Sequence, residues 1–223
     1  MRAMTQPSSR GWRTAALLIA LFGIPAVVTA NRLFAADPSS NGAIVVRELA
    51  ILGLTAFLIW VVRTRERLPL SSIGIRSDNL GRSLAWGFGL ALVCFAVLAA
   101  CLTAFAALGI HYGEGTAIAH ALPVTLLAVI RAGISEEVLY RGYALERLQT
   151  LTGSKWIAAV ITLVMFAAFH YRQGMPGVFL AFTIGAVLTG FYLWKRNLVA
   201  AMFAHFLVDF VPNVALPLLG NSN

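Results

Sequence analysis

Residues 134–143, ISEEVLYRGY, place two adjacent acids, Glu136 and Glu137, shortly after the apolar run ALPVTLLAVI at 121–130. A run of that kind is typical of a helix inside a lipid bilayer. A carboxylate at the centre of a membrane helix costs about 2.5–3.5 kcal/mol even on translocon insertion scales, so such residues face the interior of a helical bundle rather than lipid. The stretch therefore predicts a bundle of transmembrane helices with a polar site inside it.

The composition of the whole chain agrees with this prediction. Of its 223 residues, 59% are hydrophobic and only 12% are charged, and the mean hydropathy is +0.81, whereas about 25% of a soluble domain is charged. We therefore expect an all-α fold, a polytopic transmembrane helical bundle. The net charge of +8 does not indicate nucleic-acid binding, because the basic residues lie between the apolar runs and form no single basic face. Two cysteines within one apolar run, Cys94 and Cys101, lack zinc-ligand spacing and are expected to pack as free thiols.

The number of spans follows from the length of the apolar runs, since a transmembrane helix needs about 20 mostly apolar residues. Seven runs qualify, at 15–34, 44–62, 84–110, 122–145, 156–170, 177–194 and 198–219. Pro212 should kink the last run or split off a short final helix, which would give eight. The first run also has the pattern of a signal peptide, but its apolar character close to Phe34 favours a retained helix.

The orientation in the membrane follows from the basic residues, which accumulate in cytoplasmic loops. With the N-terminus inside, twelve of the 17 Lys and Arg residues are cytoplasmic: Arg2, Arg10, Arg13, Arg63, Arg65, Arg67, Arg76, Arg82, Arg147, Lys155, Lys195 and Arg196. The basic residues therefore predict a multi-pass protein with a cytoplasmic N-terminus, and the membrane in which we expect it is the bacterial inner membrane. Arg131 lies near the outer end of its helix, where we expect its side chain to reach toward the interface.

Three groups of polar residues lie in the second half of the chain, each on its own expected helix. In the first group, Glu137 and Arg141 are four residues apart with the acid first, the favourable order for an ion pair on one helix face. Glu136 points about 100° away on a regular α-helix and is expected to lack that partner. One carboxylate is thus structural, and the other is available as a general base.

The other two groups are His170, which follows Phe166 by four residues, and His205, which precedes Asp209 by four. At about 1.5 Å per helical residue, Glu136 lies ~16 Å from the cytoplasmic end of its helix, and the two histidines lie ~22 and ~12 Å from theirs. The three groups therefore meet at a similar depth. Each could instead be a packed, hydrogen-bonded link between helices, but together they favour a functional site.

These motifs resemble the CPBP family of intramembrane glutamic endopeptidases, also called the CAAX protease or Abi family. The resemblance rests on EExxxR at Glu136–Arg141, FxxxH at Phe166–His170 and HxxxD at His205–Asp209. It covers about 122–212, and it divides the chain into N-terminal transmembrane helices with a cytoplasmic loop (1–115) and a catalytic helical core (116–220). The N-terminal spans match the family only in general character.

The resemblance implies a role for each motif residue. Glu136 would activate a water molecule that His170 holds, and His205 with Asp209 would stabilise the oxyanion. Glu137, Arg141 and Phe166 would support the site: the first two pair, and Phe166 belongs to the FxxxH motif. Prenyl-protein peptidases of the family have Asn at the position of Asp209, so this carboxyl group would either donate as a neutral acid or hold His205 as an imidazolium.

The activity that the resemblance implies is hydrolysis of a peptide bond in a membrane-embedded or lipid-anchored protein, without a metal or cofactor. A zinc-dependent variant is an alternative, since two Glu and two His could bind zinc, although no HExxH is present. A non-enzymatic membrane partner or immunity-type protein is another, and a proton-coupled transporter is a third, although we find no internal repeat. The substrate does not follow from the sequence.

Overall fold

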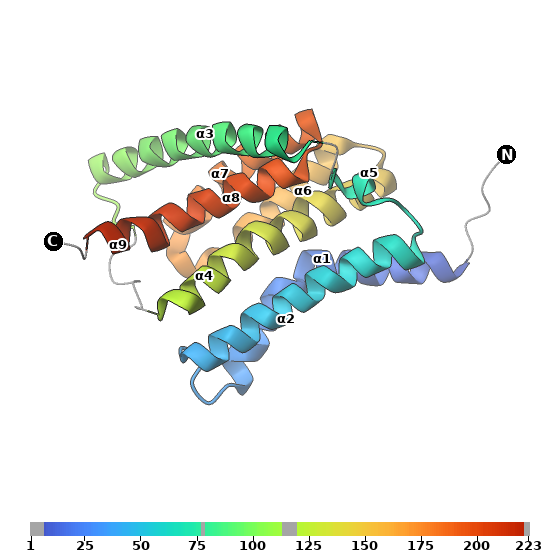
Figure 1. Cartoon of the computed structure of the whole chain (residues 1–223), viewed down its shortest axis with the longest axis horizontal. Coiled ribbons are helices and arrows are strands. Elements are labelled where there is room, and N and C mark those ends of the chain that lie inside the picture. Colours follow the sequence, from blue (N-terminus) through green and yellow to red (C-terminus); the bar gives the residue numbers. More distant parts are fainter. Residues whose placement is uncertain (1–6, 77–78, 113–119, 221–223) are drawn as a thin grey trace.

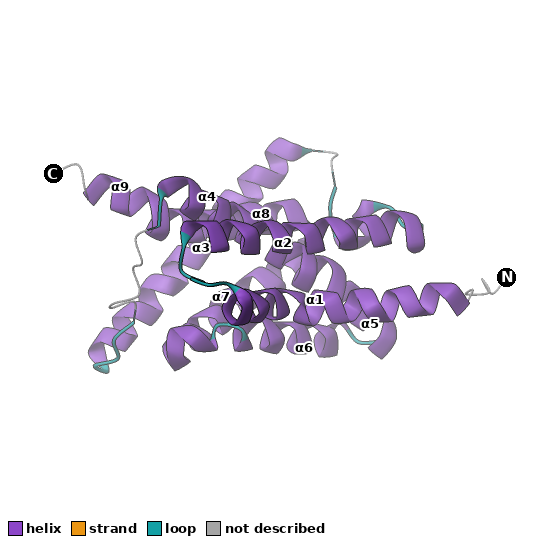
Figure 2. Cartoon of the chain, turned by 90° about the horizontal axis from the view of Figure 1, so that it is seen from below, coloured by secondary structure: helices purple, strands orange, loops and turns teal. Residues whose placement is uncertain are grey.

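The computed structural model describes residues 7–76, 79–112 and 120–220. Within these ranges the chain is helical and contains no strand, as Figure 2 shows. This confirms the predicted all-α class. By its long apolar helices the chain is an integral membrane protein.

The helices follow one another along the chain with short connections. The main ones are α1 (Pro7–Phe34), α2 (Asn41–Trp60), α3 (Leu80–Ala107), α4 (Leu122–Arg131), α5 (Glu146–Thr152), α6 (Lys155–Ala168), α7 (Gly174–Lys195), α8 (Leu198–Phe210) and α9 (Leu216–Gly220). Three segments with the wider π winding extend α2, α4 and α8: η1 (Val61–Arg65), η3 (Ala132–Leu145) and η5 (Val211–Ala215). Two short 3₁₀ turns, η2 (Leu70–Ile73) and η4 (Tyr171–Gln173), complete the set.

Among the described residues, five helical runs are long and apolar enough to cross a membrane: Gly11–Phe34, Asn41–Arg65, Leu80–Ala107, Tyr171–Lys195 and Leu198–Gly220. The expected count of seven to eight spans is therefore not confirmed. The run from α4 through η3 to α5 carries too many charges, and α6 has only 14 residues, about 21 Å of helix. Pro212 lies within η5, and the short α9 follows it, so the last run continues through the proline as one span.

The helices lie side by side and run back and forth along the long axis of the molecule (Figure 1). The start of α1, the loop after α2 and the turns around α5 and between α7 and α8 lie at one end, which is the end expected to be cytoplasmic from the basic residues. Polar side chains cap several helix starts there and elsewhere: Ser40, Asn79, Ser154 and Asn197 each accept a backbone N–H of the first turn. These caps satisfy donors that a helix start leaves free.

The segment η3 lies at the centre of the bundle and contacts α1, α2, α6 and α8. Its approach to α8 is close at Gly133, where an added Cβ would lie 3.0 Å from the backbone nitrogen of Phe206. On the other side of α8, the buried Ala200 packs beside Gly87 of α3. Small residues of this kind let membrane helices pack closely. Many large apolar side chains point outward, which suits a lipid surface, whereas the buried charges gather around η3.

Candidate active site

The wide winding of η3 sets the directions in which its polar side chains point. This segment carries Glu136, Glu137 and Arg141 and continues directly from α4. In a π winding the backbone hydrogen bonds join residues five apart, so side chains with that spacing come close together. Short stretches of π winding occur often at functional sites. The segment therefore arranges its charges differently from a regular α-helix.

Glu137 and Arg141 form the predicted ion pair. Nη1 of Arg141 donates to Oε1 of Glu137 at 2.8 Å, and both side chains are buried, with exposed fractions of 1% and 0%. The guanidinium also donates to the carbonyl oxygen of Gly185 and to Oγ1 of Thr189, each at 3.3 Å. It lies over the ring of Phe166, 4.1 Å from the centroid. This pair joins η3 to α6 and α7.

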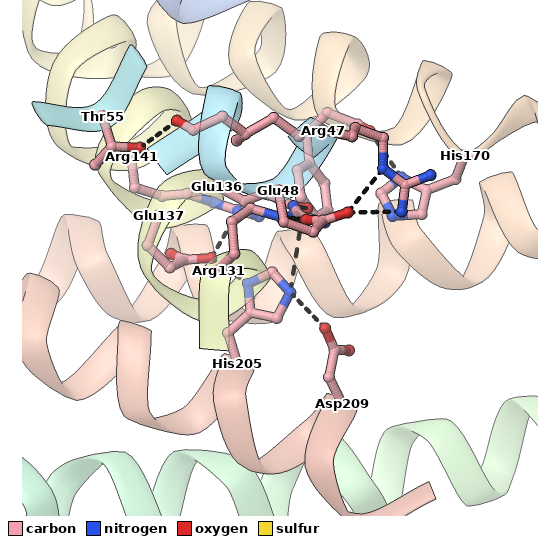
Figure 3. A network of polar contacts seen from close by, with 12 residues as sticks. Arg47, Glu48, Thr55, Arg131, Glu136, Glu137, Arg141, His170, His205 and Asp209 are labelled. Carbon is pink, nitrogen blue, oxygen red and sulfur yellow. Dashed lines mark hydrogen bonds and ion pairs between the residues drawn. The ribbon is translucent and has the colours of Figure 1, made fainter. Parts of the chain in front are cut away.

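Glu137 has a second partner that the sequence did not indicate. Its Oε1 lies 2.8 Å from Nδ1 of His205 on α8. Because Nδ1 is held in this way, Nε2 of His205 points toward Glu136, 4.0 Å from Oε2, and toward Asp209, 3.6 Å from Oδ2 (Figure 3). Glu137 therefore orients His205, a role for which sequence reasoning had considered only Asp209.

Glu136 is not the unpaired carboxylate that the sequence analysis expected. Its Oε1 accepts a hydrogen bond of 2.7 Å from Nη1 of Arg131. Arg131 was expected to reach the membrane interface, but its side chain is only 12% exposed and turns into the bundle. Both expectations were wrong for one reason. The two residues are five apart, which places them on different faces of a regular α-helix but close together where the π winding begins.

Glu48 of α2 is the site residue that sequence reasoning missed. Its side chain is fully buried, and its Oε2 accepts from Nε of Arg131. Its Oε1 accepts from the guanidinium of Arg47, at 2.7 Å from Nε and 2.6 Å from Nη2. The sequence feature that could have identified Glu48 is the presence of an acid in an otherwise apolar span. Glu48 and its neighbour Arg47 lie near the start of the apolar run 44–62, where charged residues are common, so the sequence gives this acid no prominence.

His170 and Phe166 form the side of the site that α6 supplies. Nδ1 of His170 lies 3.0 Å from the carbonyl oxygen of Phe166, so Nε2 is the nitrogen available to the site. The ring of Phe166 lies 5.0 Å from that of His170 and 6.2 Å, edge to face, from that of His205. His170 is within electrostatic range of the carboxyl groups of Glu136 and Asp209. The three predicted groups thus come together from η3, α6 and α8.

Asp209 lies at the open side of the cluster. Its side chain is 33% exposed, compared with 14% for Glu136, 8% for His205 and 0% for Glu137. The distance of 3.6 Å to Nε2 of His205 is too long for a direct hydrogen bond. Asp209 is therefore a neighbour of His205 without a direct hydrogen bond to it in this arrangement.

Some buried polar atoms of the site segment have no hydrogen-bond partner among the described residues. They are Oγ of Ser135, Oε2 of Glu137 and the hydroxyl oxygen of Tyr140. Such groups bind water or a substrate group in native sites. Within the described ranges, no three or more His, Cys, Asp and Glu side chains are grouped so as to hold a metal ion. The cluster consists of ion pairs joined to His205, and His170 is hydrogen-bonded to a backbone carbonyl.

Residues 118–211 match the family described as Rce1-like, type II CAAX prenyl endopeptidase Rce1-like. No curated protein and no solved structure matches the chain. The matched segment holds all three motifs and confirms the predicted resemblance to the CAAX protease family. Glu48 lies outside it.

Proposed function

Because residues 118–211 carry the pattern of the Rce1-like CAAX prenyl endopeptidases, we propose that this membrane protein is an endopeptidase that uses a glutamate-activated water. Its substrate is a protein or peptide embedded in the membrane or anchored to it by a lipid. We place the protein in the bacterial inner membrane, and the distribution of its basic residues favours an N-terminus in the cytoplasm.

The observation that carries this proposal is the unequal use of the two adjacent acids. Glu137 is fully buried and bound to both Arg141 and His205. Glu136 is partly exposed, with an exposed fraction of 14%, and Arg131 occupies only its Oε1. Its Oε2 lies 4.0 Å from Nε2 of His205. A polar contact of that length can be completed by a bridging water. Glu136 thus has one oxygen available to act as a base.

In the proposed reaction Glu136 acts first as a base and then as an acid. Oε2 of Glu136 takes a proton from the water, and the water oxygen attacks the carbonyl carbon of the scissile peptide. His170 holds the water, and the negative charge that develops on the carbonyl oxygen is stabilised by His205. The proton on Glu136 then passes to the leaving nitrogen as the C–N bond breaks. Preorganised donors at the oxyanion are worth about 10²–10³ in rate each.

The negative charges around His205 fit its proposed role. Glu137 binds Nδ1, so Nε2 can donate to the oxyanion when the ring carries a proton on each nitrogen. The carboxyl group of Asp209, 3.6 Å from Nε2, lies on the same side of the ring as the proposed oxyanion. As a neutral acid it would add a donor there, and as a carboxylate it would supply counter-charge for the ring.

The experiment compares cells that express the wild-type protein with cells that express Glu136→Gln at the same level. New protein termini in the membrane fraction, measured by mass spectrometry, identify cleavage. We expect a set of termini that appears with the wild type and is absent with the variant, which keeps the shape of the side chain but removes the base. A variant with the wild-type set of termini would refute the proposal, and so would a wild type that produces none.

The zinc-dependent variant of the same protease is tested in the same membranes. Addition of EDTA or phenanthroline should leave cleavage unchanged if Glu136 acts on a water held by protein groups alone. Loss of cleavage with a chelator, and its return with added zinc, would support the metal-dependent alternative.

A further inference from the structure

A chain of four charged side chains leads from α2 to the proposed base. Glu48 lies between Arg47 and Arg131, and Arg131 lies between Glu48 and Glu136. The four residues come from α2, the end of α4 and η3. Figure 3 shows this network together with His205 and Asp209. The proposed site therefore depends on a helix outside the segment that matches the family.

Stability alone is a weak reason for this arrangement. Glu48 is completely buried within the span Asn41–Arg65. Buried ion pairs often contribute little net stability, because removing both charges from water costs as much as their attraction returns. Ionisable groups within membrane spans usually serve a functional site. We therefore look for a function of Glu48 in the proposed active site.

The donor geometry of Arg131 suggests that role. A guanidinium can bind both oxygens of one carboxylate through two parallel N–H groups. Here Glu48 takes Nε, and Glu136 receives a single bond of 2.7 Å from Nη1 to Oε1. Oε2 of Glu136 is thereby left facing His205. Without Glu48, Arg131 could close on both oxygens of Glu136 and occupy the one that the proposed reaction needs.

We infer that Glu48 and Arg131 are a positioning pair that holds Glu136 by one oxygen and leaves the other free to act as the base. This inference rests on the proposed function. Neither residue touches the substrate, and both act through Glu136. Arg47, which is 25% exposed, neutralises the remaining charge of Glu48 from the rim of the bundle.

The test removes both charges of the pair at once, in Glu48→Gln/Arg131→Gln, so that the net charge of the bundle is unchanged. The chain offers a matched control in Glu66 and Arg147, a second buried pair of Glu and Arg at the other end of the bundle. Their exposed fractions of 1% and 11% resemble the 0% and 12% of Glu48 and Arg131. The control variant is Glu66→Gln/Arg147→Gln.

Each variant is purified in detergent, and its melting temperature is measured. The substrate for kcat and KM is a protein whose cleavage was found in the comparison of wild-type and Glu136→Gln membranes. A misplaced catalytic group can cost about 10²-fold in rate. We expect kcat of Glu48→Gln/Arg131→Gln to fall by about that factor with KM within about threefold of wild type. The control should keep kcat within about threefold, whatever it loses in melting temperature.

A second variant covers the case in which the double variant does not fold. Arg131→Lys keeps the buried charge, but an ammonium lacks the guanidinium fork that spans two acids. We expect it to melt near the wild-type temperature with kcat reduced at least about tenfold.

The Glu136→Gln protein distinguishes failure of the positioning inference from failure of the proposed function. If Glu136→Gln is inactive but kcat of Glu48→Gln/Arg131→Gln equals that of the control, or Arg131→Lys turns over at the wild-type rate, only the positioning inference fails. If Glu136→Gln itself turns over at the wild-type rate, the proposed function fails, and the inference fails with it.

Discussion

Replacing Glu137 by Gln should affect folding and activity together, unlike the same change at Glu136. Gln keeps the size of the side chain but removes the negative charge between Arg141 and His205. Arg141, only 1% exposed, would keep just its contacts with the carbonyl of Gly185, the hydroxyl of Thr189 and the ring of Phe166. None of these carries a countercharge.

The expected size of the effect follows from that burial. Removing one partner of a buried ion pair costs about 3–5 kcal/mol, because the remaining charge stays buried without compensation. For a chain of this length, each kcal/mol lowers the melting temperature by about 2–4 °C. Glu137→Gln should therefore melt about 6–20 °C below the wild type. Glu136→Gln should melt close to the wild type, since Arg131 keeps Glu48 as a partner.

The measurement is thermal unfolding of the three purified proteins in one detergent at one scan rate, followed by cleavage at a temperature at which all remain folded. Unfolding of membrane proteins is often irreversible, so only melting temperatures recorded under identical conditions are compared. A Glu137→Gln protein that melts with the wild type and is merely slow would contradict the reasoning. Glu137 would then share in the chemistry, and the division of roles between the two acids would be wrong.

Two further predictions concern Asp209 and Gly185. Asp209→Asn should retain cleavage, because the amide has the same shape and can donate toward an oxyanion. Asp209→Ala should lose about 10²–10³ in kcat. Equal cleavage rates for the two variants would place Asp209 outside the reaction. Gly185→Ala should lower the melting temperature by an amount equivalent to about 1–3 kcal/mol, because its Cβ would lie 3.0 Å from Nη2 of Arg141 and 2.9 Å from Leu163. The control is Gly190→Ala on the same helix, where an added Cβ meets no atom within 4 Å, and it should be neutral or slightly stabilising. Similar melting temperatures for the two variants would argue against close packing around Arg141.

The parts of the site that the sequence predicts are those governed by local geometry or by depth. The pairing of Glu137 with Arg141 depends only on a spacing of four residues along one helix, and it is confirmed. The meeting of the three polar groups follows from counting residues from the helix ends, and the contact between His205 and Glu137 agrees with it. Both rules hold whatever the detailed packing of the bundle.

The parts that the sequence does not predict depend on how helices wind and pack. Arg131 reaches Glu136 because π winding begins between them, and the amino-acid pattern of the segment does not distinguish this winding from a regular α-helix. Glu48 reaches the site because α2 packs against α4 and η3. A single sequence does not show which residues of two helices lie opposite each other when the helices are far apart along the chain. A charged residue in an apolar span indicates that it has a polar or charged partner in the bundle, but the sequence does not identify that partner.

The contact between Glu48 and Arg131 also bears on how the protein is made, since 83 positions separate the two residues. A ribosome adds about 5–20 residues per second, so α2 is synthesised about 4–17 s before its partner arginine. During that interval the nascent acid has Arg47, its immediate neighbour, as a countercharge. We therefore expect Arg47 to supply the countercharge of Glu48 until Arg131 has been synthesised and the bundle has assembled.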